Sequence, residues 1–168
     1  MNLNRAERVS PGSLPASLFS PGLWRIAGTG GATIGPFEFA ATVPPALLWM
    51  NRDELTSIDR QQDQRVIWEP AGYTDADVAT VSLAPAVPQF GAAASPQILC
   101  RAPATAGMLT IPSSLLQGLS TARIASLTVT VAPRPGRRSV FSLPLTNGST
   151  ARSIFDYSFS EALITEIR

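Results

Sequence analysis

Apolar and polar side chains alternate with a period of two residues along much of the chain. The clearest runs are 37–43, 127–131 and 141–145, in which every second residue is apolar. Successive side chains of an extended strand point to opposite faces, so this pattern predicts half-buried β-strands. Further strands of this kind are predicted at 23–26, 65–68, 77–83, 97–101, 108–111 and 155–159. Together the runs predict about nine short strands.

Turn residues indicate how some of these strands pair. Glycines at 28, 30 and 31 separate the runs 23–26 and 37–43, which predicts a β-hairpin. The runs 97–101 and 108–111 are expected to form a further pair. Fifteen prolines and twelve glycines spread along the chain leave no room for a long helix.

Two segments depart from the strand pattern. Residues 112–118 are predicted to form one short helix, which Gly118 can close in a left-handed conformation. The segment 160–168 carries three apolar residues at helical spacing, so a helix and a frayed strand both stay open there. These three residues are Leu163, Ile164 and Ile167.

The lack of long helices decides the predicted fold class. Parallel strands need long crossover connections, which this chain does not offer. We therefore predict an all-β chain folded as a two-sheet antiparallel sandwich of immunoglobulin-like or jelly-roll-like type. One sandwich domain is predicted at 14–159, with an N-terminal extension at 1–13 and a C-terminal tail at 160–168.

Charge and composition narrow the range of partners. The 168 residues include thirteen arginines and twelve acids, for a net charge of +1. A balanced charge does not attract nucleic acid, and no segment reads as a membrane span or an export signal. The arginines at 134–138 are expected to form a solvated turn or, alternatively, a phosphate or glycan contact. Cys100 is the only cysteine, which excludes an intrachain disulfide, and its apolar neighbours predict a buried, inert thiol.

Histidine is absent, which removes the usual general base, nitrogen metal ligand and triad partner. We therefore expect no enzymatic activity and no cofactor. A pair of carboxylates of the glycoside hydrolase type is the least favoured hypothesis, because the acids from 53 to 77 are expected to be solvated loop charges. The calcium candidates among these acids are Asp59, Asp63, Asp75 and Asp77, although their spacing matches no EF-hand loop.

The aromatic residues divide between predicted strands and predicted loops. Trp24, Trp49 and Trp68 lie in strand-like runs on apolar faces and are expected to pack in the core. Tyr73 and Phe90 fall in predicted loops, so we expect their rings to face solvent. Because sugars stack on exposed rings, these two residues are the ligand-binding candidates.

Several strings of the sequence resemble one group of proteins. They lie at residues 22–26, 30–31, 34–37, 49–53, 58–60, 66–68, 100–112 and 127–131. These strings resemble an uncharacterised β-sandwich domain found toward the C-terminal ends of large secreted or surface proteins of acidobacteria. The part from 66 to 129 is similar, more loosely, to immunoglobulin-like modules of microbial cell-wall proteins.

The resemblance implies an extracellular or cell-surface location and display on a larger chain, and it brings no catalytic residue or ligand. Our first functional hypothesis is therefore a non-catalytic structural or adhesive module. The alternative is a carbohydrate-binding module that uses Tyr73 and Phe90. Other surface proteins or glycans are the expected partners, and self-association through edge strands or the 160–168 tail stays open.

Overall fold

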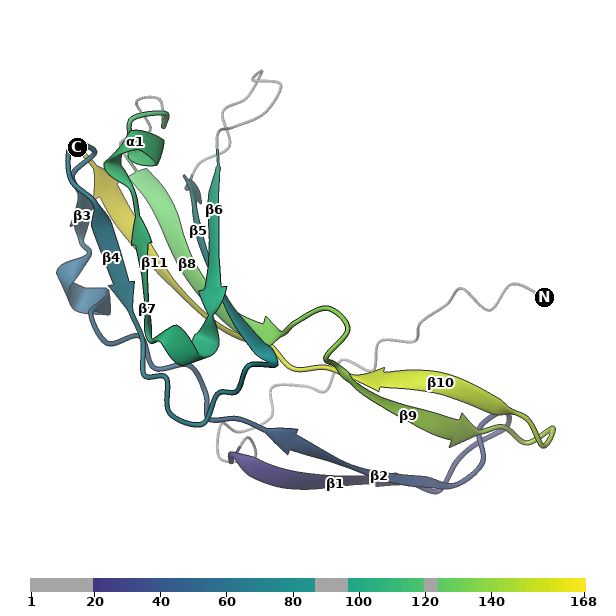
Figure 1. The fold of residues 1–168 in the computed structure, drawn as a ribbon. Coiled ribbons are helices and arrows are strands. Elements are labelled where there is room, and N and C mark those ends of the chain that lie inside the picture. The colour runs from purple at the N-terminus through teal and green to yellow at the C-terminus, as the bar shows by residue number, and fades with distance from the viewer. Residues whose placement is uncertain (1–19, 87–96, 120–123) are drawn as a thin grey trace, which may run out of the picture.

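The computed structural model describes residues 20–86, 97–119 and 124–168, and its regular structure is almost entirely β-strand (Figure 1). The strands are β1 (Gly22–Gly28), β2 (Phe37–Val43), β3 (Ser57–Ile58), β4 (Gln64–Ile67), β5 (Asp77–Pro85), β6 (Ile98–Pro103), β7 (Met108–Ile111), β8 (Ile124–Pro133), β9 (Ser139–Pro144), β10 (Thr150–Phe155) and β11 (Phe159–Ile167). The helical segments are α1 (Ser113–Leu116) and two 3-10 helices, Arg52–Glu54 and Ala104–Ala106. The predictions of an all-β chain and of a short helix near 112–118 are confirmed.

Five strands form the largest sheet, in the order β3-β11-β8-β5-β6. β3 runs parallel to β11, whereas all other neighbours in this sheet are antiparallel. The period of two predicted for β5 and β8 is confirmed, because every second side chain of each strand is buried. These buried side chains lie opposite one another in the pairs Leu83–Leu127, Val81–Val129 and Ala79–Val131.

A smaller layer covers one face of this sheet. β4 and β7 form an antiparallel pair, and an isolated bridge joins Trp49 to Trp68 beside it. Trp68 and Ile111 are 1% and 0% exposed and belong to the same buried cluster as the inward residues of β5 and β8. We call the strands β3 to β8 together with β11 the body.

The other four strands form two antiparallel hairpins, β1–β2 and β9–β10, so the hairpin predicted at 23–26 and 37–43 is confirmed. A bridge joins Ile34 to Leu145, and the Gly35 N–H donates to the Pro144 carbonyl at 2.8 Å. The hairpins therefore meet near their tips, and in Figure 1 they lie side by side and project away from the body. The β9–β10 hairpin is inserted between β8 and β11, which are neighbours in the five-stranded sheet. We call the two hairpins the arm.

The predicted pairing of 97–101 with 108–111 is wrong. β6 pairs with β5 in the large sheet, whereas β7 pairs with β4 in the smaller layer. The 3-10 helix Ala104–Ala106 and Gly107, which has a φ of 68°, carry the chain from one layer to the other. A hairpin and a crossing between layers both need two alternating runs around a turn, so the residue pattern does not separate them.

The C-terminal segment is an integral strand, and the helical alternative for 160–168 is wrong. β11 pairs along its length with β8 and at its end with β3, so this segment belongs to the sheet and not to a separate tail. Thr165 is 2% exposed, and its hydroxyl donates to the Leu55 carbonyl at 2.7 Å. The run 155–159 is likewise not one strand, because β10 ends and β11 begins within it.

Candidate functional site

A layer of phenylalanine rings holds the two hairpins of the arm together. Phe39 of β2 stacks on Phe141 of β9 with ring centroids 3.7 Å apart, and the Phe155 ring of β10 lies 6.1 Å from the Phe39 ring. All three side chains are only half-buried, because two strands on each side are too narrow to enclose them. A two-stranded hairpin is marginally stable alone, so the arm depends on this layer.

The outer face of β9–β10 presents aliphatic side chains to solvent. Val140 and Ile154 lie opposite each other across the hairpin and are 48% and 52% exposed. Together with Arg138, Arg152 and Pro135 they line a shallow hollow of about 230 Å³. We call Val140, Arg152 and Ile154 the arm patch. Exposed apolar surface rimmed by charged groups is typical of a protein interaction site.

A second hollow, the junction pocket, lies where the arm meets the body. Its lining includes Thr42 of β2, Arg137 shortly before β9, Ser139 at the start of β9, Phe155 at the end of β10, and Tyr157 in the connection from β10 to β11. The volume of the junction pocket is about 150 Å³. Small-molecule sites usually measure roughly 300–1,000 Å³, so this pocket suits a small chemical group and not a whole ligand of that class.

A buried carboxylate lines the junction pocket and joins the arm to the body. Asp77, the first residue of β5, is 2% exposed. One of its oxygens accepts hydrogen bonds from the Thr74 N–H at 2.8 Å and from the Thr74 hydroxyl at 3.1 Å. The other oxygen accepts a hydrogen bond from the Tyr157 hydroxyl, which lies in the connection between β10 and β11. This contact fixes the segment through which the chain re-enters the body.

Both tyrosines near this carboxylate hold their protons more tightly than usual. Burial first, and then the hydrogen bond to Asp77, raises the pKa of Tyr157 above its ordinary value. Burial, followed by the negative charge of Asp77, raises the pKa of Tyr73 to about 12. Both effects favour the neutral phenol in the folded chain.

We expect the protein to lose stability in alkali because of these two phenols. Above pH 10 the unfolded chain releases phenol protons that the folded chain still holds. Deprotonation therefore stabilises the unfolded state relative to the folded state. This contribution to stability is fully present below pH 10 and is lost as the pH rises through the raised pKa values. Tyr157→Phe should make the free energy of unfolding in urea fall less steeply over about pH 9 to 12. An identical pH dependence in both proteins would contradict the expectation.

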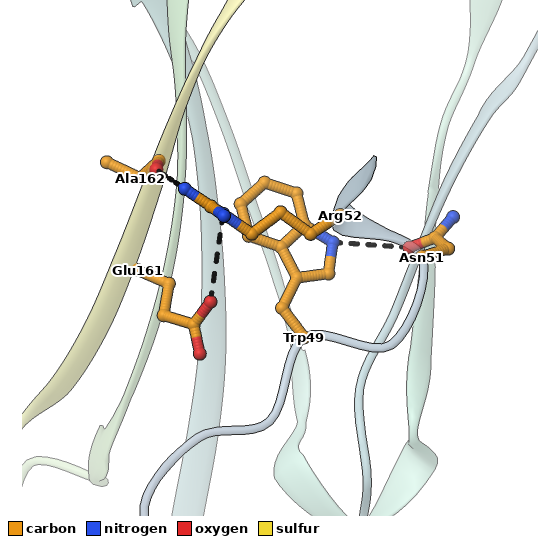
Figure 2. Close-up of polar contacts among 5 residues, drawn as sticks. All are labelled: Trp49, Asn51, Arg52, Glu161 and Ala162. Atoms are coloured by element: carbon orange, nitrogen blue, oxygen red, sulfur yellow. Dashed lines mark hydrogen bonds and ion pairs between the residues drawn. The ribbon is translucent and has the colours of Figure 1, made fainter. Parts of the chain in front are cut away.

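A second polar cluster closes one side of the body (Figure 2). The Trp49 Nε1–H donates to the Asn51 side-chain oxygen at 3.2 Å, and the same oxygen accepts the Ile67 N–H at 2.9 Å. The Asn51 amide group also donates to the Arg65 carbonyl at 2.9 Å. Asn51 is 8% exposed, so its side chain acts as a buried connector between β4 and the segment before the first 3-10 helix.

Arg52 reaches from this cluster to the edge of the large sheet. Figure 2 shows its guanidinium donating to the Ala162 carbonyl of β11 at 3.2 Å, with Nε 3.9 Å from the Glu161 carboxylate. β3 pairs with β11 only at Glu166 and Ile167, so Arg52 caps a part of that edge which β3 leaves open. A charged cap of this kind blunts edge-to-edge pairing. The cluster in Figure 2 therefore serves the fold.

The exposure expected for the Tyr73 ring is wrong. The residue is 8% exposed, and its hydroxyl donates to the Pro45 carbonyl at 3.2 Å. Tyr73 lies in a tight turn in which its N–H donates to the Pro70 carbonyl, and this turn directs the ring inward. Phe90 lies outside the described residues. Tyr73 therefore does not present an exposed ring for sugar stacking.

The tryptophans divide between the two parts of the molecule. Trp49 and Trp68 lie in the body core as predicted, with 4% and 1% exposure. Trp24 is only half-buried and lies on β1 in the arm, so its expected place in the core is wrong. Cys100 is half-buried on β6, and burial raises the pKa of its thiol.

The acidic candidates serve separate local contacts. Asp59 accepts the Gln61 N–H, and Asp63 accepts the N–H of Ser113 at the start of α1, both at 2.8 Å. Asp75 is exposed, whereas Asp77 is buried, which corrects its expected role as a solvated charge. Within residues 20–86, 97–119 and 124–168, no group of three or more acidic or cysteine side chains is arranged to hold a metal ion.

The arm patch was missed by the reading of the sequence, although a signal for it is present. Val140 precedes Phe141, and Ile154 precedes Phe155. Two adjacent large apolar residues in a strand place apolar side chains on both of its faces. Only one face of each hairpin is used inside the arm, so the second face carries the patch.

Comparisons with known proteins give no match: no protein-family model, curated protein or solved structure corresponds to this chain. In the described part of the chain, no helix has both the length and the apolar character required to cross a membrane.

Proposed function

We propose that this protein is a non-catalytic, extracellular structural or adhesive module in which the body is a scaffold and the arm makes the contact. The observation that carries the proposal is the insertion of the β9–β10 hairpin between β8 and β11. The chain leaves the large sheet after β8, forms the β9–β10 hairpin of the arm and returns to the neighbouring position in the sheet as β11. Binding residues are commonly held on projections from a rigid scaffold, and this arrangement has that form.

We also propose that the body is a two-sheet sandwich of the immunoglobulin-like kind. The strand order β3-β11-β8-β5-β6 facing the β4–β7 pair is the arrangement that supports this. In such sandwiches the connection between the last two strands lies at one end beside the connection between the second and third, and this end recognises ligands in antibody variable domains. The corresponding connections here are the β9–β10 insertion and the loop between β4 and β5. The junction pocket lies between them.

The hydrogen bonds of the buried polar side chains support the proposed role of the body as a rigid scaffold. The described residues include three buried polar or charged side chains, Asn51, Asp77 and Thr165. Each of them bonds to a different segment of the chain: Asn51 to β4, Asp77 to the arm connection and Thr165 to Leu55. Groups whose hydrogen-bonding capacity is used in this way specify and rigidify a fold.

Adhesion tests the proposal directly. Fluorescent beads that carry the whole protein would be offered bacterial cell-envelope fragments, beads that carry the same protein, and neutral polysaccharides such as cellulose and chitin. We expect retention on one of the first two surfaces and about a tenfold loss of retention for Ile154→Asp, because a charge placed in the arm patch opposes burial of its aliphatic surface. No turnover of ester, glycoside or peptide substrates is expected.

Ile67→Asp is the matched control, since Ile67 is an exposed isoleucine on the body, 38% exposed. This variant should keep its retention. Equal losses for Ile67→Asp and Ile154→Asp, or turnover of any substrate by the pure protein, would contradict the proposed function.

Carbohydrate binding is the second candidate, and the junction pocket is the feature that favours it. The pocket combines a guanidinium from Arg137, hydroxyls from Thr42 and Ser139 and the Phe155 ring, which together can donate to and pack against part of a sugar. Retention on a polysaccharide that falls with Arg137→Ala and not with Ile154→Asp would favour this candidate over adhesion through the arm patch.

A further inference from the structure

A second exposed aliphatic patch lies at the far end of the body. Ile124 and Ile164 are 49% and 61% exposed. Glu166 lies directly opposite Ile124 across the β8–β11 pair and two residues along β11 from Ile164, so all three side chains share the outer face of the sheet. They line a hollow of about 450 Å³ together with Thr56 and Arg168. We call Ile124, Ile164 and Glu166 the end patch.

The arm patch and the end patch share one spacing along a strand and carry charged side chains of opposite sign. Glu166 also pairs with Arg168 at 3.3 Å, but these side chains are 63% and 70% exposed, so the Glu166 carboxylate can still accept a second arginine. On β10, Arg152 lies two residues from Ile154, which faces Val140 across the hairpin. On β11, Glu166 lies two residues from Ile164, and it faces Ile124. In both strands the charged and the aliphatic side chain stand about 7 Å apart on one face, since a strand rises about 3.3–3.4 Å per residue. When the two strands of different copies are laid face to face, Arg152 can therefore contact Glu166 while Ile154 contacts Ile164.

One chain cannot satisfy both patches by itself. In Figure 1 the C-terminal end of β11 and the β9–β10 hairpin lie at opposite ends of the molecule. The segment 134–156, which includes the arm patch, carries four arginines and one acid. Among the described residues, Arg138 pairs with Asp156 at 3.2 Å, and no hydrogen bond or ion pair of Arg152 is found. Arg152 is therefore available to an outside carboxylate.

We propose that the arm patch of one copy binds the end patch of a second copy, so that copies join head to tail. This inference rests on the proposed adhesive role of the arm and names its partner. A contact between two different surfaces either closes into a reciprocal pair or ring, or repeats from copy to copy in an open series of chains. Each contact is small and individually weak, and copies held side by side on a surface gain strength through multivalency.

Charge reversal tests the contact. Light scattering of the whole protein over a roughly hundredfold range of concentration should show a mass that rises above that of one chain. Arg152→Glu alone and Glu166→Arg alone should each weaken association about tenfold, because each turns one attraction into a repulsion. An equimolar mixture of these two variants should regain association, since every contact between unlike copies pairs opposite charges again. Arg101→Glu, an exposed arginine on β6 outside both patches, should behave as the native protein.

The outcomes separate the inference from the proposed function. A single-chain mass for the native protein at every concentration overturns the head-to-tail contact, even where adhesion to envelope fragments through the arm is retained. A mass that stops at two chains fits two copies paired reciprocally, arm to end and end to arm, and supports the contact if Arg152→Glu and Glu166→Arg each lower it; a two-chain mass that neither variant changes overturns the contact. Failure of the mixture to recover, with both variants folded by circular dichroism, assigns the association to some other surface and also overturns it.

Discussion

Trp68→Ala is expected to lower the free energy of unfolding by about 3–5 kcal/mol, the usual effect of truncating a fully buried tryptophan. The side chain is 1% exposed and stands between the two layers of the body. Its Nε1–H also donates to the Ala104 carbonyl at 2.7 Å. The substitution therefore opens a cavity and removes the shorter of the two hydrogen bonds that the buried Ala104 carbonyl accepts, leaving the one from the Gly107 N–H at 3.4 Å. Urea unfolding followed by far-ultraviolet circular dichroism measures the loss.

Trp24→Ala is the matched control for this variant. Trp24 is half-buried in the arm, so the same truncation should cost at most about 2 kcal/mol. A larger loss for Trp24→Ala than for Trp68→Ala would contradict the view that the body supplies most of the stability. Trp68→Phe, which retains much of the apolar volume, should fall between the native protein and Trp68→Ala.

Asn51→Ala is expected to lower the free energy of unfolding by about 3 kcal/mol, although it removes only a small polar group. The substitution deprives three groups of their partners: the Trp49 Nε1–H, the Ile67 N–H and the Arg65 carbonyl. A buried polar group that loses its partner pays the full cost of desolvation, about 1–3 kcal/mol for each group. The denaturation midpoint in urea should fall with little change in slope.

Asn147→Ala provides the comparison on the surface. Asn147 lies in the exposed turn between β9 and β10, where its side-chain oxygen accepts the Ser149 N–H at 3.0 Å. Water can replace that partner, so the free energy of unfolding is expected to fall by less than about 1 kcal/mol. Similar losses of stability for Asn51→Ala and Asn147→Ala would mean that the buried hydrogen bonds of Asn51 contribute little to the free energy of unfolding.

Local periodicity predicts the strands of this protein well and their partners poorly. The alternation at 127–131 identified β8 and its buried face, because side-chain direction in a strand depends only on parity. The partner of β6 was misassigned, since nothing in residues 97–111 tells a hairpin from a crossing between layers. Trp24 and Trp68 lie in similar local patterns, yet one is in the arm and the other in the core. That difference arises from which strands pack together, which is a long-range property.

The candidate sites show the same limit. Tyr73 was correctly expected outside a strand, but the turn that begins at Pro70 directs its ring inward to the Pro45 carbonyl. Asp77 looks like any loop-edge acid in the sequence, and its partner Tyr157 lies 80 residues away. The apolar pairs in β9 and β10 could have revealed the arm patch. What that patch faces depends on how the two hairpins are arranged, and the sequence pattern does not contain that information.

The most direct test of the division between scaffold and arm compares adhesion with stability in one variant, Ile154→Asp. The exposed position of Ile154 predicts that its thermal midpoint stays within about 3 °C of the native value, because it removes little buried surface. Bead retention should nevertheless fall about tenfold. Unchanged retention, or a midpoint that falls in step with retention, would contradict the assignment of contact to the arm and of stability to the body.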